Sequence, residues 1–236
     1  MLYVNGEWRN ANSGELMEVI NPATKEVIAK VAYAGAEETR EAIEHAHEAF
    51  KKWKNVPAME RSEYLKKAVA LMREKSEEIA ETITKEMGKP INEARREVVS
   101  ASAYLEWFAE EARRIYGDTV PANQSNKHLM VLRQPVGVTA AITPWNFPLS
   151  MITRKIAPAI AAGCTVVVKP APATPLSAMK VFECFHEAGL PAGVANLIIG
   201  DAESIGREFT SNPLVRKLTF TGSTAVGKKL IRDCAD

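Results

Sequence analysis

Short apolar segments alternate with helical segments through the second half of the chain, and this alternation limits the possible folds more than any other feature of the sequence. Strands are predicted near 138–143, 165–169, 195–199 and 216–221, with helices near 149–162 and 175–188 and further helices from 202 and from 224. Apolar strands separated by helices are typical of a parallel sheet that is buried on both faces. The sequence therefore predicts the α/β class, with a doubly wound parallel sheet.

The helix predicted after the second of these strands has clear signals at both ends. Thr174 carries a hydroxyl that can accept a hydrogen bond from the first turn, and Pro175 suits the first helical position. Gly189 suits the left-handed conformation of the residue that follows many helices. We therefore predict that this helix begins at Pro175 and ends just before Gly189.

The first half of the chain, from 36 to 116, is rich in charge and carries three apolar stripes at helical spacing. The stripes consist of Ile43, Ala46, Phe50 and Trp53; of Leu65, Val69, Met72, Ile79, Ile83 and Met87; and of Ile91, Ala94, Val98, Ala101, Leu105, Phe108, Ala112 and Ile115. Each stripe predicts an amphipathic helix with one buried face. The third stripe could instead pair with a partner helix in a coiled coil, but we favour core packing because this stripe is short and isolated. These helices are expected to form an N-terminal helical layer on the sheet.

The balance of charge excludes several classes of partner. The chain has 30 basic and 29 acidic side chains, a formal net charge of +1, and no basic tract. Electrostatic binding to nucleic acid or to a membrane surface is therefore not expected. The longest apolar run, 156–168, is interrupted by Pro158 and Gly163 and is shorter than the roughly 20 residues that span a bilayer. Because the N-terminus also lacks the pattern of a secretion signal, we expect a cytoplasmic protein.

Cysteine and histidine give no indication of a metal site or of disulfides. The cysteines are Cys164, Cys184 and Cys234, and the histidines are His45, His47, His128 and His186. The odd number of cysteines, without C-x-x-C spacing, fits a reducing compartment. We interpret all seven residues as structural or surface residues and expect no bound metal.

Three turns that follow predicted strands have an unusual composition, and ligands of open parallel sheets bind at such turns. The first turn, 143–148, presents Asn146 between two prolines, where a rigid amide can donate a hydrogen bond to a developing oxyanion. Composition alone favours a plainer interpretation, a turn with Trp145 in the core. The second turn begins with Lys169, whose ammonium can point at ribose hydroxyls or phosphate. Simple solvation of a strand end explains this lysine equally well.

The third turn contains Gly222 and Ser223 between a strand and a helix. A glycine at this place lets the backbone approach a phosphate, and the N-terminus of the helix favours negative charge. Gly222, Gly227 and Lys228 also satisfy the G-x-x-x-x-G-K pattern of a P-loop. The next residue is Lys229, however, where a magnesium-binding P-loop has Ser or Thr. A P-loop phosphotransferase is therefore only an alternative.

Taken together and in this order, the segments TPWNFP, RKIAPAIAAGCTVVVKPAPATPLSA and LTFTGSTAVG resemble the NAD(P)-dependent aldehyde dehydrogenases. The earlier segments NPATKEVIAKV and EMGKPINEARREV resemble the same family. TSNPLVRKLTFTGST and MITRKIAPAIAAGC are similar to its succinate-semialdehyde dehydrogenase branch in particular. The resemblance covers the whole chain but only about the first half of a typical member.

The resemblance implies roles for individual residues. Asn146 would donate a hydrogen bond to the oxyanion of a thiohemiacetal, and Arg154 would bind the carboxylate of succinate semialdehyde, which a guanidinium can do with two hydrogen bonds. A surface arginine on a helix is the alternative for Arg154. The implied cofactor-binding residues are Thr143, Pro144, Trp145, Asn146, Lys169, Pro172, Gly200, Phe220, Gly222, Ser223 and Val226. The implied cofactor is NADP or NAD. Many NAD-preferring members have Glu where this chain has Pro172, so that acceptance of NADP is expected.

The resemblance also implies a division of the chain. Residues 1–118 would be the N-terminal helical part of the cofactor domain, 119–136 the start of an oligomerisation arm, and 137–236 the Rossmann-like NAD(P)-binding part. The family's cysteine nucleophile and glutamate base belong to motifs that follow these segments, and none of the three cysteines occupies a matching position. The last helix stops at Cys234–Asp236 without a cap, as in a truncated domain. We therefore expect the catalytic domain to be absent from this chain and the chain alone to be inactive.

The sequence thus predicts an oxidoreductase that converts a small-molecule aldehyde, in particular succinate semialdehyde, into its carboxylic acid. The resemblance further implies that the full-length form is a homo-oligomer, a dimer or a tetramer. A non-catalytic dinucleotide-binding or interaction module is the main alternative.

Overall fold

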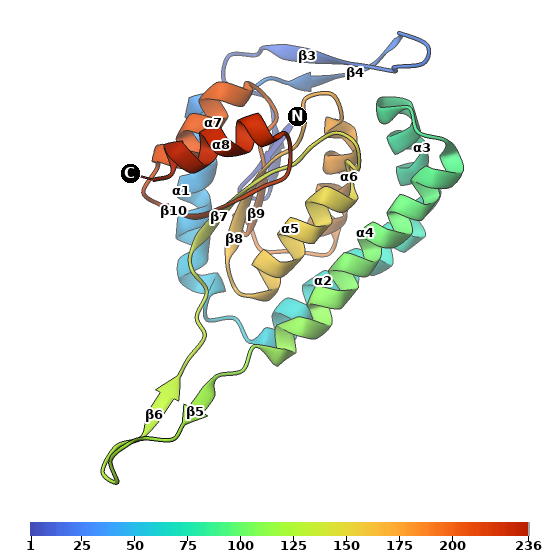
Figure 1. The fold of residues 1–236 in the computed structure, drawn as a ribbon. Coiled ribbons are helices and arrows are strands. Elements are labelled where there is room, and N and C mark those ends of the chain that lie inside the picture. Colours follow the sequence, from blue (N-terminus) through green and yellow to red (C-terminus); the bar gives the residue numbers. More distant parts are fainter. Residues whose placement is uncertain (236) are drawn as a thin grey trace.

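A six-stranded sheet with the order β10-β7-β8-β9-β1-β2 lies at the centre of the computed structural model, which describes residues 1–235 (Figure 1). Its parallel strands are β7 (Val138–Ile142), β8 (Thr165–Lys169), β9 (Ala195–Leu197) and β10 (Val215–Phe220). β8 is buried along its whole length because helices cover both faces of the sheet. The chain passes from β7 to β8 and β9 on one side and then returns to place β10 on the other side of β7. The predicted doubly wound arrangement is confirmed.

The N-terminus adds two antiparallel strands that the sequence analysis did not predict. β1 (Leu2–Val4) pairs with β9 through Tyr3 and Leu197, and β2 (Glu7–Arg9) pairs with β1. The sheet is therefore mixed, and the first residues of the chain belong to it. Strands of three residues are too short to show the alternating pattern by which a strand is recognised.

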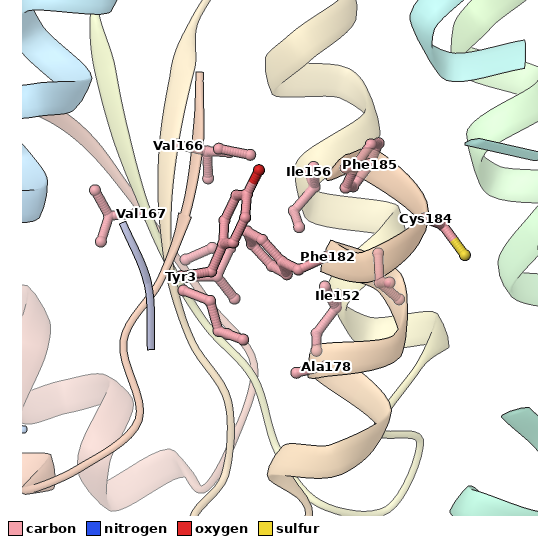
Figure 2. Packing of buried hydrophobic residues seen from close by; sticks show 14 of the residues in the cluster. Tyr3, Ile152, Ile156, Val166, Val167, Ala178, Phe182, Cys184 and Phe185 are labelled. Atoms are coloured by element: carbon pink, nitrogen blue, oxygen red, sulfur yellow. The ribbon is translucent and has the colours of Figure 1, made fainter. Parts of the chain in front are cut away.

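Helices cover the two faces of the sheet unequally. α5 (Ser150–Ala161) and α6 (Pro175–Glu187) lie on one face, whereas α1 (Ala36–Trp53), α7 (Ala202–Ser211) and α8 (Thr224–Asp233) lie on the other (Figure 1). Figure 2 shows Ile152 and Ile156 of α5 and Phe182 and Phe185 of α6 packed toward Val166 and Tyr3 of the sheet. All six side chains are buried, so this interface forms the centre of the hydrophobic core.

An outer layer of three helices covers α5 and α6. It consists of α2 (Ala58–Glu74), α3 (Ser76–Met87) and α4 (Ile91–Glu111). The predicted apolar stripe of α4 is buried against α2, α3 and α5, which confirms core packing over a coiled-coil partner. The layer differs from the prediction in two respects. α1 lies on the opposite face of the sheet. The second predicted stripe belongs to two helices, which are separated at Lys75. The sequence did not reveal this break, because an interruption of one residue leaves the apolar spacing in phase.

The helix ends agree with the sequence in one case and not in another. α6 begins at Pro175, and Gly189 follows its end with a φ of 75°, as predicted. The third predicted stripe runs past the C-terminal end of its helix. α4 ends at Glu111, a short 3₁₀ turn follows at Ala112–Arg114, and Ile115 is exposed.

Two antiparallel hairpins complete the structure. β3 (Leu16–Ile20) and β4 (Val27–Ala32) pair beside the sheet, and β5 (Asp118–Val120) and β6 (Leu129–Val131) form a ribbon that projects away from the body (Figure 1). The ribbon, residues 118–131, overlaps the segment 119–136 that the resemblance set apart as the start of an oligomerisation arm, and the role of this segment stays a prediction.

Gly200 joins the link between β4 and α1 to the end of β9. The Ala34 amide donates to the Ile199 carbonyl and the Asp201 amide donates to the Ala34 carbonyl, both at 2.9 Å. A Cβ at Gly200 would lie 1.9 Å from the Ala34 carbonyl oxygen. Only glycine permits this approach of two backbones.

We expect Gly200→Ala to lower the free energy of unfolding by about 2–3 kcal/mol, because the new methyl group must displace backbone rather than a flexible side chain. Gly206 in α7 is the matched control, since a Cβ there would meet nothing within 4 Å. Gly206→Ala is expected to raise the stability by roughly 0.5–1 kcal/mol. Urea unfolding measures both variants, and equal effects from the two substitutions would contradict this role of Gly200.

Candidate functional site

The turns that follow β7, β8 and β10 begin side by side at one edge of the sheet. Ile142 pairs with Lys169 on one side and with Phe220 on the other, so the three strands end in register. The Thr143 amide donates to the Lys169 carbonyl, and the Thr221 amide donates to the Ile142 carbonyl, each at 3.1 Å. The structure therefore brings together the three turns that the sequence singled out.

The first turn presents its side chains outward. Trp145, Asn146 and Phe147 are exposed, whereas Thr143 at the end of β7 is buried. The interpretation of Trp145 as a core residue is wrong, because 57% of its surface is accessible. The Thr143 hydroxyl has no hydrogen-bond partner within residues 1–235. A buried hydroxyl at a strand end and an exposed amide three residues later both offer hydrogen bonds to a ligand.

The backbone of this turn is held from the outer layer. The Lys89 ammonium donates to the Asn146 carbonyl at 3.2 Å and lies 4.2 Å from the centroid of the Phe147 ring. The same ammonium forms an ion pair with Glu97, and both of these side chains are buried. The Glu97 carboxylate also accepts hydrogen bonds from the amides of Leu149 and Ser150, at 2.9 and 3.1 Å. One buried carboxylate therefore connects α4 to the N-terminus of α5.

Lys169 is buried at the end of β8, so solvation of a strand end does not explain it. Its ammonium donates to the Pro170 carbonyl at 3.3 Å. Burial lowers the pKa of Lys169 to about 8, while the charge of Asp201 acts in the opposite direction. A buried ammonium with one long hydrogen bond retains donors for an oxygen-rich ligand and is stabilised when such a ligand binds.

The third turn leads into α8 with its backbone uncovered. Gly222 and Ser223 are exposed, and a Cβ at Gly222 would lie 2.5 Å from the Phe220 ring. The Ser223 hydroxyl accepts a hydrogen bond from the Val226 amide at 3.3 Å and so caps the helix. The N-terminus of α8 thus meets the requirements of an anion site. Lys229, the residue that departs from the P-loop pattern, is paired with Asp233 at 2.6 Å.

The remaining predicted cofactor residues have different surroundings. Pro172 and Val226 are exposed, in the turn before α6 and in the first turn of α8. Pro144 is half-buried beside Thr143. Gly200 follows β9 and is required by the contact with Ala34 whether or not a ligand binds. The structure brings all of these residues to the carboxyl edge of the sheet or to the helices that begin there, and their cofactor contacts stay a prediction.

Arg154 lies on α5 and borders a cavity of about 410 Å³ between α4 and α5. Its guanidinium carbon lies 5.1 Å from the centroid of the Tyr104 ring. Phe147 and a second arginine, Arg96, border the same cavity, which therefore opens beside the turn that carries Asn146. Sequence reasoning did not find Arg96, because a single arginine on a charge-rich helix carries no distinguishing pattern.

Sequence reasoning also did not find Lys155, a half-buried lysine on α5. The Lys155 ammonium donates to the Thr219 hydroxyl at 3.1 Å and borders a cavity of about 360 Å³ together with Cys164 and Lys217. Burial lowers the pKa of Lys155 to about 8.

Glu86 caps α6 in place of the residue that the sequence predicted. Its carboxylate accepts hydrogen bonds from the amides of Leu176 and Ser177, at 2.7 and 2.8 Å, and from the Ser177 hydroxyl. Thr174 occupies the N-cap position as predicted, but its hydroxyl makes no capping bond and has no partner within residues 1–235. A carboxyl group has two acceptor oxygens and reaches both amides at once, so Glu86 takes the place of the threonine side chain.

The cysteines offer no nucleophile at this edge. Cys164 and Cys184 are buried, and burial raises the pKa of the Cys184 thiol to about 12. Cys234 is exposed at the end of α8. Partial desolvation and the charge of Asp233 raise the pKa of its thiol as well. Among residues 1–235 no group of three His, Cys, Asp or Glu side chains is placed to hold a metal ion, and no helix has the length and apolarity needed to cross a membrane.

A parallel sheet whose strand order reverses at β7, with a buried lysine and an open helix N-terminus at the point of reversal, is the architecture of dinucleotide-binding α/β domains. Residues 8–236 match the sequence profile described as "Aldehyde dehydrogenase family", and the chain belongs to that family.

Individual relatives cover nearly the whole chain. It is 53% identical over 99% of its length to a glutarate-semialdehyde dehydrogenase from Pseudomonas putida, and 52% identical over 98% to the succinate-semialdehyde dehydrogenase [NADP(+)] from Escherichia coli. A crystal structure of an NADP-dependent enzyme from E. coli superposes on 100% of the chain with a TM-score of 0.99 and 51% identity. The chain spans 48% of the length of each of these two relatives and 49% of that crystallised chain.

The buried position of Glu86 makes a pH dependence of stability testable. Burial raises the pKa of Glu86 from 4.5 to about 7, although the hydrogen bonds from Ser177 and Leu176 act in the opposite direction. Between these two values the folded chain holds a proton that the unfolded chain has lost, so this contribution to stability is complete below pH 4.5 and disappears as the pH rises through 7. We expect the free energy of unfolding of the wild-type chain to fall by about 2–3 kcal/mol between pH 4.5 and 7.5 because of Glu86, and Glu86→Gln to remove this fall.

Urea unfolding across this pH range compares Glu86→Gln with the wild-type chain, and Glu60→Gln on the exposed start of α2 serves as the control. The Glu60 variant should follow the wild-type pH profile. A Glu86→Gln profile that is parallel to the wild-type profile would contradict the raised pKa.

Proposed function

We propose that the protein to which this chain belongs oxidises an aldehyde that carries a distal carboxylate, with succinate semialdehyde as its substrate, and uses NADP or NAD as the oxidant. The observation that carries this proposal is the convergence of the turns after β7, β8 and β10. The exposed amide after β7 has the buried ammonium of β8 on one side and the open helix N-terminus after β10 on the other. Both named relatives, by their names, act on semialdehydes, which have an aldehyde at one end and a carboxylate at the other.

The residues present at the edge of the sheet fit a dinucleotide. Lys169 would bind ribose hydroxyls, because its ammonium is buried and incompletely hydrogen-bonded. The N-terminus of α8, with Gly222 and Ser223, would bind the pyrophosphate through backbone amides. Thr143, Pro144 and Trp145 would lie along the cofactor, as would Phe220 and Gly200, with Pro172 and Val226 at the adenosine end. The bound cofactor supplies the acceptor for a hydride.

The side chains of the first turn and of α5 would act on the aldehyde. Asn146 would donate a hydrogen bond to the oxyanion that forms when a nucleophile attacks the carbonyl carbon, and one such donor contributes about 10²–10³-fold to a rate. Arg154 would bind the distal carboxylate of the substrate from the cavity between α4 and α5. The mechanism that the family resemblance implies also requires a cysteine nucleophile and a glutamate base. Since no cysteine of residues 1–235 lies at this edge, residues 1–236 alone are expected to bind the cofactor without oxidising the aldehyde.

The projecting β5–β6 ribbon is proposed as part of a contact between copies of the protein. Its strands and the segment that follows expose large apolar side chains, namely Val120, Leu129, Met130, Val131, Leu132 and Val136. A two-stranded ribbon with exposed apolar residues and free edges is stabilised when further strands cover it. The proposed assembly is a dimer or a tetramer of the whole protein.

The identity of residue 172 predicts the response to the 2′-phosphate of NADP. We expect the chain to bind NADP, and Pro172→Glu to weaken NADP binding about tenfold while it changes NAD binding less than about threefold, because a carboxylate repels the phosphate. Pro213→Glu, an exposed proline before β10 at the opposite edge of the sheet, is the matched control and should change neither affinity. Titration of each cofactor against the chain measures both affinities, and wild-type binding of NAD at least tenfold tighter than that of NADP would overturn the expected acceptance of NADP.

Arg154→Gln tests the substrate class in the whole protein. We expect kcat/KM for succinate semialdehyde to fall about 10–100-fold, because a charge-assisted pair with the carboxylate is lost, whereas kcat/KM for butyraldehyde changes less than about threefold. Arg113→Gln, at an exposed arginine beyond the end of α4, should leave both values unchanged. NADP reduction followed spectrophotometrically measures these rates. If the wild-type protein oxidises no aldehyde, the proposed function is wrong; equal losses for both aldehydes would remove Arg154 from substrate recognition.

A further inference from the structure

Asn146 is exposed through its side chain and fixed through its backbone. Its carbonyl accepts the hydrogen bond from Lys89, while its side-chain amide makes no hydrogen bond with residues 1–235 that the geometry supports. The residue that follows, Phe147, lies under the Lys89 ammonium and its carbonyl accepts the Met151 amide of α5 at 3.0 Å. The contacts therefore restrain the peptide and leave the amide free to donate.

The direction of Lys89 is set by the end of α3. Gly88 ends this helix in the left-handed conformation, with a φ of 86°, and a Cβ there would lie 2.8 Å from the ring of Pro22. Pro90 then begins the path into α4 with extended backbone. Lys89, the single residue between the glycine and the proline, points inward, and its side chain reaches the turn after β7.

Glu97 provides the charge that allows Lys89 to be buried. An unpaired ammonium at this depth would lose its hydration without compensation, and the ion pair offsets that cost only when its remaining groups are also hydrogen-bonded. Glu97 satisfies this condition, because its second oxygen accepts the amides of Leu149 and Ser150 at the start of α5. The pair thus restrains both ends of the segment from Asn146 to Ser150.

We propose that Lys89 and Glu97 are positioning residues that aim the Asn146 side-chain amide at the reacting carbonyl. The proposal rests on the function proposed above for Asn146. Neither side chain touches the substrate in this role: Lys89 holds the Asn146 carbonyl, and Glu97 holds Lys89 and the N-terminus of α5. A displacement of about 1 Å at a donor of this kind costs on the order of 10²-fold in rate.

The mobility of Asn146 in the 236-residue chain tests the proposal without any catalytic assay. The variant is Lys89→Met with Glu97→Gln, which removes both charges together, keeps unbranched side chains of similar size and leaves an amide oxygen to accept from α5. We expect ¹⁵N relaxation to give a backbone order parameter of about 0.85 at Asn146 in the wild type and below about 0.6 in the variant. Lys89→Arg, which keeps the donor and the charge, should stay rigid.

The matched control removes an exposed ion pair of the same composition. Lys85 and Glu81 form such a pair along α3, at 3.1 Å. Lys85→Met with Glu81→Gln should leave the order parameter of Asn146 at its wild-type value. An Asn146 that stays as rigid in the Lys89 and Glu97 double variant as in the wild type would overturn the proposal.

A mutant cycle in the whole protein tests whether the restraint acts through Asn146. Lys89→Met with Glu97→Gln should lower kcat at least tenfold, with the KM for NADP changed less than about threefold, and should lower it less than twofold when Asn146→Ala is already present. A merely structural role would lower kcat equally in both backgrounds, and that result would overturn the proposal. A wild-type protein without aldehyde oxidation would refute the proposed function instead, and the order parameters would still decide whether the pair restrains Asn146.

Discussion

The pairing of β7 with both β8 and β10 is the constraint on which the rest of the site depends. Because Ile142 is opposite Lys169 and Phe220 at once, the three strands end at the same level and their turns meet. A shift of one residue would turn every side chain of a strand to the other face of the sheet. All five side chains of β8 are buried, so such a shift would require the packing on both faces of this strand to be rebuilt. The register of the core therefore determines where Thr143, Lys169 and Gly222 stand.

The outer helical layer completes the site because it caps the N-termini of the two helices that lie between it and the sheet. The first amides of an α-helix have no partner within the helix, and neither α5 nor α6 has a side chain of its own that caps them. Glu97 from α4 and Glu86 from α3 supply buried carboxylates to these two N-termini. The negative charge of Glu97, which is paired with Lys89, also interacts favourably with the dipole of α5. The two carboxylates thus fix both α5, which carries Arg154, and the turn before α6, which carries Pro172.

The sequence predicted the local elements that depend on neighbouring residues. Alternation of apolar strands with helices placed β7, β8, β9 and β10, and the resemblance in TPWNFP and LTFTGSTAVG directed attention to the turns that meet at the carboxyl edge. Contacts between residues far apart in the sequence were not predicted. Lys89 lies in the link between α3 and α4, and Glu97 lies on α4. Both are surrounded in the sequence by charged residues, and only the tertiary structure distinguishes these two buried residues from their exposed neighbours. The same limit explains why Thr174 was predicted as the capping side chain while Glu86, about 90 positions away, performs that task.

A crystal structure of the chain soaked with NADP tests the central claim most directly. We expect pyrophosphate oxygens at hydrogen-bonding distance from the backbone amides at the start of α8, and a ribose hydroxyl about 3 Å from the Lys169 ammonium. Electron density for the cofactor at the amino edge of the sheet, or in a cavity that none of the turns after β7, β8 and β10 borders, would contradict it.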